Sequence, residues 1–185
     1  MKFKLLIAAL ATSLAAETAS AQVFVIGNGL GGECYQKTKN TIRTYRDAEE
    51  VCSRALREQA MTKANRAGTF VNRGVLRMRD GNYDGALKDY ESAIELVPDL
   101  GAAYLNQGAA YIYIRDFDSA FASLNRAIEL DSADLFAAYY NRAIAREQTG
   151  DVTGAYYDFQ KSLELKPDWD LAMRQLNRFS IEDQS

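Results

Sequence analysis

The sequence predicts an all-α protein, a right-handed solenoid of stacked antiparallel helix hairpins with a capping helix at its C-terminal end. Segments that begin at Phe70, Tyr104 and Tyr139 repeat one pattern at steps of 34 and then 35 residues. In each copy apolar residues recur at helical spacing on both sides of a polar turn. The chain's 2 prolines, Pro98 and Pro167, end the first and third copies at the same place. One hairpin of this size cannot bury its apolar face alone, so neighbouring copies are expected to stack.

The first 21 residues have the pattern of a secretory signal peptide. A basic start precedes the apolar run Leu5–Ala16, and Ala-Ser-Ala at residues 19–21 fits the small-x-small rule for cleavage. We therefore expect an exported mature chain that begins at Gln22, periplasmic in a Gram-negative source or otherwise secreted. An uncleaved anchor helix is the alternative. The apolar run is too short to span a bilayer, so no membrane span is expected in the mature form.

Residues 22–32 are predicted to form a flexible, glycine-rich arm. Within it, Gly27–Gly32 matches G-x-G-x-x-G after the strand-like run Val23–Ile26. In dinucleotide-binding folds such glycines let the backbone approach a pyrophosphate. That motif also needs a second parallel strand that ends in an acidic residue, whereas Glu49 and Glu50 fall within a helical pattern. We expect no cofactor here, and a dinucleotide-binding enzyme is the third alternative for function.

Residues 33–69 are expected to form a degenerate leading hairpin, since terminal repeats have one face without a neighbour. Ala48, Cys52 and Ala55 repeat the spacing of the later second helices, and a short first helix would place Cys34 opposite Cys52. Two cysteines in an exported chain predict a Cys34–Cys52 disulfide. Such a crosslink would stabilise the fold by about 3 kcal/mol in the entropic model. The alternative is two buried thiols that pack as small apolar groups.

Residues 70–169 are predicted to hold three full repeats, and residues 170–185 the capping helix and a tail. The repeats are expected at about 67–100, 101–135 and 136–169. In the first copy the recurring positions are Phe70, Gly74, Ala86, Tyr90, Ala93 and Pro98. This period and this order of aromatic, small, small, aromatic, small and proline positions resemble the tetratricopeptide repeat family. The resemblance implies a close approach of the two helices at each first small position.

Two arginines depart from the pattern of that family. Arg73 and Arg77 stand where its members carry apolar residues, and we expect their aliphatic stems to pack in place of those residues. No tryptophan opens any of the repeats. These departures concern details of the packing rather than the predicted architecture.

Three asparagines occupy one place in successive first helices. Asn72, Asn106 and Asn141 each stand two residues after an aromatic anchor, a place that, by the resemblance, lines the concave groove of the solenoid. Each amide offers a donor and an acceptor. A row of three in register could therefore hold the backbone of an extended peptide whatever its side chains. The alternative is that each asparagine only bonds to a neighbouring helix.

The same resemblance implies that further first-helix residues face this groove, with Arg79 and Glu147 at its edges. They are Val71, Val75, Met78, Leu105, Ala109, Ile112, Tyr113, Tyr140 and Ile144. Such an apolar, tyrosine-bearing lining favours a hydrophobic peptide or a partner helix over an acidic tail. Alternatively, the groove is filled by the chain's own arm, Val23–Ile26.

Composition narrows the function further. The chain has no histidine, the commonest general base and transition-metal ligand, so neither catalysis nor a metal site is expected. A formal net charge of −3 without a basic cluster argues against a nucleic-acid partner. We predict a non-catalytic module that binds a protein or peptide outside the cytoplasm; its oligomeric state is left open, with a monomer favoured. The second alternative is a structural or self-associating subunit of a cell-envelope assembly.

Overall fold

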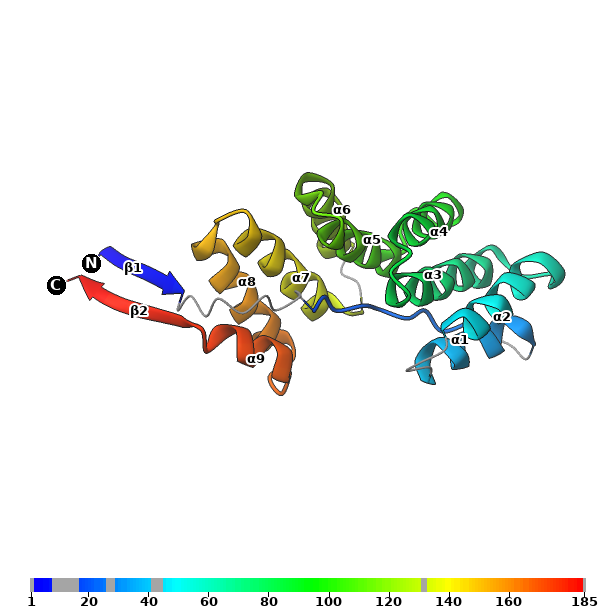
Figure 1. Ribbon diagram of the computed structural model, residues 1–185, viewed down its shortest axis with the longest axis horizontal. Helices are drawn as coiled ribbons and strands as arrows, with labels where there is room; N and C mark the ends of the chain where they lie inside the picture. The colour runs from blue at the N-terminus through cyan, green and yellow to red at the C-terminus, as the bar shows by residue number, and fades with distance from the viewer. Residues whose placement is uncertain (1, 8–16, 26–28, 41–44, 131–132, 185) are drawn as a thin grey trace.

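The computed structural model describes residues 2–7, 17–25, 29–40, 45–130 and 133–184. In these residues the chain forms nine helices and one two-stranded ribbon, and the helices stack as hairpins into an elongated solenoid (Figure 1). The helices are α1 (Leu30–Asn40), α2 (Tyr45–Glu58), α3 (Lys63–Arg79), α4 (Tyr83–Leu96), α5 (Gly101–Tyr113), α6 (Phe117–Glu129), α7 (Leu135–Gln148), α8 (Val152–Leu165) and α9 (Asp170–Leu176). The predicted all-α repeat architecture is therefore confirmed.

Capped turns join the helices of each repeat. The side chains of Asn82, Asp116 and Asp151 accept hydrogen bonds from backbone N–H groups at the starts of α4, α6 and α8. Each cap satisfies a donor that the first turn of a helix leaves unpaired. Gly81 and Gly150 precede two of these caps with φ angles of 80° and 87°, the left-handed conformation that glycine adopts without strain.

Small residues let the two helices of a hairpin approach closely. A Cβ atom added to Gly74 would lie 2.4 Å from Cε1 of Tyr90, and one added to Gly108 would lie 2.5 Å from Cγ of Leu124. Both distances are far below a van der Waals contact. The ring of Tyr90 and the side chain of Leu124 therefore pack directly on the backbone of the first helix, as the repeat pattern predicts.

The leading hairpin is α1 and α2, joined by the Cys34–Cys52 disulfide with a Cα–Cα distance of 4.7 Å. Both cysteines are buried beside Ala48 and Leu76. Helix α1 begins at Leu30, three residues before the predicted start of the hairpin. The last glycines of the predicted arm, up to Gly32, thus belong to a helix.

The arginines that depart from the repeat pattern do more than pack their stems. Arg73 and Arg77 both bind the buried carboxylate of Asp89 in α4, with closest N–O distances of 2.6 and 3.0 Å. Arg77 also binds Glu49 of α2, at 2.7 Å. The sequence pattern suggests only caps and solvated groups for the acidic residues, so it does not reveal this buried cluster.

The third repeat has the same cluster. There Arg142 and Arg146 bind the buried Asp158, with closest N–O distances of 2.8 and 3.0 Å. In the middle repeat the equivalent pair is neutral, and Ser123 bonds to Gln107 over 3.0 Å. The equivalent place between the two helices thus holds a charged cluster in the first and third repeats and a neutral hydrogen-bonded pair in the middle repeat.

The two ends of the chain meet in the ribbon. Strands β1 (Lys2–Ile7) and β2 (Phe179–Gln184) pair antiparallel in a register that runs from Lys2 opposite Gln184 to Ile7 opposite Phe179. The sequence predicts only a tail after the capping helix. It misses β2 because the partner strand lies in the segment assigned to the leader, and backbone pairing needs no side-chain pattern. Among the described residues, no helix is both long and apolar enough to cross a membrane.

Candidate functional site

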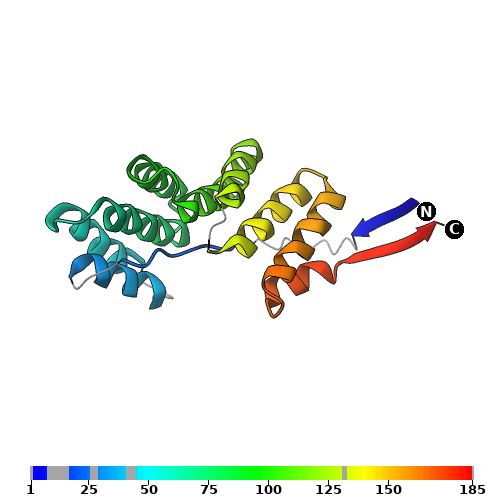
Figure 2. The same ribbon diagram turned by 180° about the vertical axis from the view of Figure 1, so that it is seen from behind.

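The candidate site is the face formed by the first helices of the three repeats, α3, α5 and α7. From here on, the arm means residues 17–25 rather than the predicted 22–32. It runs along this face in an extended conformation, past α7, α5 and α3 to the leading hairpin (Figure 2). It lies opposite the three asparagines. The site therefore has an occupant, which is part of the same chain.

Each asparagine holds one residue of the arm by two hydrogen bonds. Asn141 accepts from N–H of Ala19 and donates to its carbonyl, both over 2.8 Å. Asn106 does the same for Ala21, over 3.0 and 2.7 Å. Asn72 does so for Val23, also over 3.0 and 2.7 Å. We call these three pairs the asparagine ladder.

The ladder forms because the spacing of the asparagines along the solenoid matches the two-residue period of an extended chain. Each repeat supplies one asparagine, and the bound residues of the arm are two apart. In an extended chain, residues two apart direct their N–H and C=O groups to the same side, about 7 Å from one another. The solenoid therefore presents its amides at the spacing of an extended peptide. Since only backbone atoms are bonded, the ladder itself is indifferent to side chains.

All three asparagines are fully buried. A buried amide that lost its partners would cost about 1–3 kcal/mol for each group left unpaired. Asn106 also donates its second amide proton to the carbonyl of Ala102, over 2.8 Å. This bond to its own helix identifies the nitrogen of the amide, so Nδ2 and Oδ1 cannot exchange places without loss.

The side chains of the arm alternate between the groove and solvent. Ala21 and Val25 are 3% and 4% exposed, and Ala19 and Val23 are half-buried. Between them Ser20 and Phe24 are exposed. The residues held by the ladder thus also turn their side chains to the helices.

Most of the predicted groove residues are buried at or near the arm. Leu105, Ile112, Tyr140 and Ile144 lie in one apolar cluster with Ala21. Val71 lies in the cluster against which Val23 packs. Ala109 is likewise buried. Tyr140 stands toward the C-terminal end, where it packs on Phe159 and Trp169.

The remaining predicted residues border the other side of the arm. Val75, Met78 and Tyr113 line a hollow of about 160 Å³ with Arg79, Thr18 and Ser20. Arg79 also donates to the carbonyl of Thr38 in α1, over 2.7 Å. Glu147, at the other predicted edge, binds Arg178 beyond the capping helix.

Sequence reasoning names Val23–Ile26 as the segment that could fill the groove. The structure extends the occupant back to Ala19 and Ala21, which the sequence assigns to the leader, while Ile26 lies outside the described residues. Gly68, which contacts Val23, is also missed. One signal was available, because Ala19, Ala21, Val23 and Val25 already alternate with the period of a strand that has one buried face.

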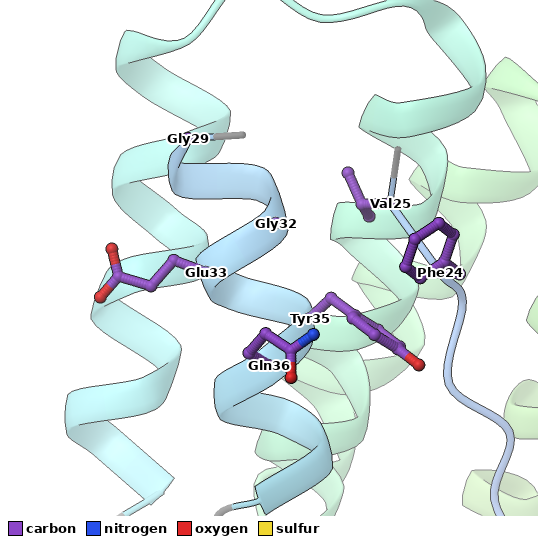
Figure 3. A pocket seen from close by; sticks show the side chains of 7 residues that line it. All are labelled: Phe24, Val25, Gly29, Gly32, Glu33, Tyr35 and Gln36. Atoms are coloured by element: carbon purple, nitrogen blue, oxygen red, sulfur yellow. The ribbon is translucent and has the colours of Figure 1, made fainter. Parts of the chain in front are cut away.

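Among the described residues, the surroundings of the glycine-rich stretch differ from those of a dinucleotide-binding fold. The residues before it belong to the arm, which bonds to asparagine side chains rather than to a neighbouring parallel strand. Gly27 lies outside the described residues, and Gly29 has a φ of 128° just before α1. Figure 3 shows a hollow at this place, where Phe24 and Tyr35 face each other with ring centroids 5.2 Å apart. The acidic Glu33 also lines it and would repel a pyrophosphate, which has the same sign of charge.

The fold defines a helical repeat protein whose first helices hold an extended segment of the same chain. Residues 65–133 match the family model of the tetratricopeptide repeat. Human serine/threonine-protein phosphatase 5 is 34% identical over 86 residues, which are 46% of this chain and 17% of the relative. The chain thus spans less than a fifth of that protein.

Solved structures agree on the fold. The first tetratricopeptide domain of Spaghetti (RPAP3), bound to the HSP90 peptide SRMEEVD, matches with a TM-score of 0.58 and 25% identity, over 62% of this chain and 90% of that one. The crystal structure of MamA matches with a TM-score of 0.64 and 21% identity, over 82% of each chain. The second likeness concerns the fold alone.

Proposed function

We propose that this protein is a non-catalytic peptide-binding module that acts outside the cytoplasm, and that its concave groove holds an extended peptide by the asparagine ladder. One observation carries the proposal. Asn72, Asn106 and Asn141 each make two hydrogen bonds to alternate residues of one extended segment. The arm thus displays the binding mode that a separate peptide would adopt.

Removal of the leader would open the groove. Cleavage after Ala21 would remove the residues bound by Asn141 and Asn106, and would leave Val23 on Asn72. Two buried amides would then lack their partners, and an incoming peptide would supply them. Export and processing thus turn an occupied groove into an available one.

A solved relative supports peptide binding as the general role. The matched domain of RPAP3 carries an HSP90 peptide that ends in Glu-Glu-Val-Asp. The groove of the present chain is lined by Leu105, Ile112 and Ile144 where it meets the arm. This apolar lining supports a hydrophobic ligand rather than an acidic one.

A direct test uses the chain that begins at Gln22. The probe is a labelled peptide with the sequence of residues 17–25, and binding is followed by fluorescence polarisation. The variant N72A/N106A/N141A is expected to lose at least about tenfold in affinity, because it lacks the four hydrogen bonds that Asn106 and Asn141 offer to the peptide. The matched control is Asn177→Ala, at an exposed asparagine, and should bind like the parent. Equal affinity of the triple variant and its parent would exclude the ladder.

Export is tested separately. The N-terminal sequence of the protein purified from its native source should begin at Gln22, and the protein should fractionate outside the cytoplasm. A chain that keeps its first 21 residues would contradict the proposal of an opened groove.

Self-association is the second candidate, and one observation favours it. The arm bonds to the ladder through backbone atoms alone, so in a chain that keeps its leader the arm of another copy could occupy the same groove. Sedimentation equilibrium separates the candidates. A mass that stays monomeric up to high concentration supports the peptide-binding module, and a mass that rises with concentration supports the assembly subunit.

A further inference from the structure

The groove restricts the size of the side chains that face it. Ala21, at the middle of the ladder, is 3% exposed and lies in a cluster with Leu105, Ile112 and Ile144. Close-packed interiors accommodate extra methylene groups poorly. At this place a larger side chain would have to displace the arm from Asn106 or push the helices apart.

The N-terminal end of the groove, near the leading hairpin, is fitted to two valines. A Cβ atom added to Gly68 in α3 would lie 2.8 Å from Cγ1 of Val23, and 3.4 Å from Cγ2 of Val25. A Cβ atom added to Gly31 in α1 would lie 3.1 Å from Cγ1 of Val25. The two glycines thus supply the space that the valine methyl groups fill.

The other side of the arm is permissive. Phe24 is 63% exposed and Ser20 is also exposed. Beside Thr18 and Ser20 lies the hollow of about 160 Å³ bounded by Val75, Met78 and Tyr113. A larger residue has room here, so the outward positions place little restriction on a ligand.

The polarity of the peptide is also defined. Because the bond to Ala102 orients the amide of Asn106, its oxygen faces an N–H group and its nitrogen a carbonyl of the bound chain. A peptide that ran in the opposite direction would present these two groups in exchanged order. The ladder therefore selects the direction of the arm, from α7 toward α1.

We infer that the groove selects a class of ligand: extended segments with a small residue at the position held by Asn106, then valine-sized residues at the next two alternate positions. The pattern is small-x-Val-x-Val, in the direction of residues 21–25. This inference rests on the proposed function and adds the chemistry of the ligand to it. It also assigns Gly68 as a residue that determines specificity.

The full chain offers a test, because its own arm is the probe. Hydrogen exchange of the amides of Ala19, Ala21 and Val23 reports whether the arm is seated. Ala21→Leu should accelerate this exchange by about tenfold or more, since the side chain does not fit. The matched control, Ser20→Leu, adds a similar side chain on the outward side and should change exchange by about twofold at most.

A compensating pair tests the role of Gly68. Gly68→Ala should release the arm, and the added Val23→Ala should seat it again, because the methyl group that collides is then gone. Thermal melting of each variant shows whether the solenoid itself stays folded. The inference is overturned if Gly68→Ala acts equally in the parent chain and in the Val23→Ala variant, or if Ala21→Leu and Ser20→Leu act alike.

A further variant separates this inference from the proposed function. Asn106→Ala removes the ladder bonds at Ala21 without changing the size of any arm residue. If Asn106→Ala releases the arm while the size variants act alike, the ladder stands and only the size rule fails. If Asn106→Ala leaves the arm seated, the ladder itself fails.

Discussion

At the scale of single residues, buried polar atoms decide what the groove can do. Asn72, Asn106 and Asn141 are buried, and their amides are bonded to the arm. Tyr90 is equally buried, but its hydroxyl has no hydrogen-bond partner among the described residues. The hydrogen bonds of the asparagines are supplied by a segment that another peptide could replace. The buried hydroxyl of Tyr90, in contrast, lowers the stability of the fold whether or not the groove is occupied.

Tyr90→Phe is therefore expected to stabilise the protein by about 1 kcal/mol at neutral pH, since it removes an unpaired buried hydroxyl. The ring keeps its contact with Gly74. Urea denaturation measures the change. Tyr157→Phe, at a side chain that is 62% exposed, is the matched control and should have no effect. A loss of stability in Tyr90→Phe would show that the hydroxyl does have a partner.

The same residue should make the stability depend on alkaline pH. Burial raises the pKa of Tyr90 well above its ordinary value. A tyrosine whose pKa is raised in the folded state keeps its proton longer there than in the unfolded chain. The stability is therefore unchanged below the unfolded pKa, about 10, and falls as the pH rises from there toward the folded pKa. Tyr90→Phe should therefore lose less stability than the parent between about pH 9 and 11. Parallel stability curves for the two proteins would contradict this expectation.

At the scale of the element, the equivalent turns of the three repeats differ in one residue. The residue with a positive φ is a glycine in two of them and an arginine in the middle one. Gly81, Arg115 and Gly150 precede the second helices of the three repeats, with φ angles of 80°, 64° and 87°. A side chain in this left-handed region costs about 1 kcal/mol. Arg115→Gly is therefore expected to raise the free energy of unfolding by about 0.5–1 kcal/mol in a denaturant titration.

Arg115→Ala is the control for that change. It removes the same exposed guanidinium group but keeps a Cβ atom at the strained position, so it should not gain stability. An equal gain in both variants would mean that the guanidinium, rather than the backbone, is the cause.

The charged clusters lead to a second prediction at this scale. Asp158→Ser should destabilise the third repeat by about 3–5 kcal/mol, because Arg142 and Arg146 lose their buried partner. The triple variant R142Q/R146Y/D158S copies the middle repeat, where Gln107 and Ser123 bond to each other. It should recover much of that loss, since a neutral pair has no buried charge to compensate. A triple variant no more stable than Asp158→Ser would contradict this reasoning.

At the scale of the whole molecule, the sequence predicts what local patterns encode. The period of the repeat predicts the helices and the stack, and it places Asn72, Asn106 and Asn141 in register. The occupant could be predicted only in part, since Val23–Ile26 is one alternative and residues 19–21 are assigned to the leader. The bond from Ala19 to Asn141 joins residues 122 positions apart, and no local pattern records such a pairing. The charged clusters around Asp89 and Asp158 could not be predicted for a similar reason. A carboxylate in a helix is expected to face water unless its arginine partners on another helix are known.

The arm also changes how the solenoid should unfold. In a stack of repeats each unit contacts mainly its neighbours, so ends can unfold independently. Here a single segment bonds to α7, α5 and α3 in turn. The full chain is therefore expected to unfold in one transition. The chain that begins at Gln22 should unfold over a wider range of denaturant, with a lower midpoint and a smaller m-value.

A peptide with the sequence of residues 17–25 should restore the sharp transition of the shorter chain. At one hundred times its dissociation constant, a ligand that binds only the folded state adds about 2.7 kcal/mol. The full-length variant N72A/N106A/N141A should resemble the shorter chain, because it has the arm without the bonds. If the full chain, the shorter chain and the triple variant shared one midpoint and one m-value, the arm would contribute nothing to the stability or cooperativity of the solenoid. A difference that the peptide abolishes would show that the ligand site and the cooperativity of the solenoid depend on the same six hydrogen bonds.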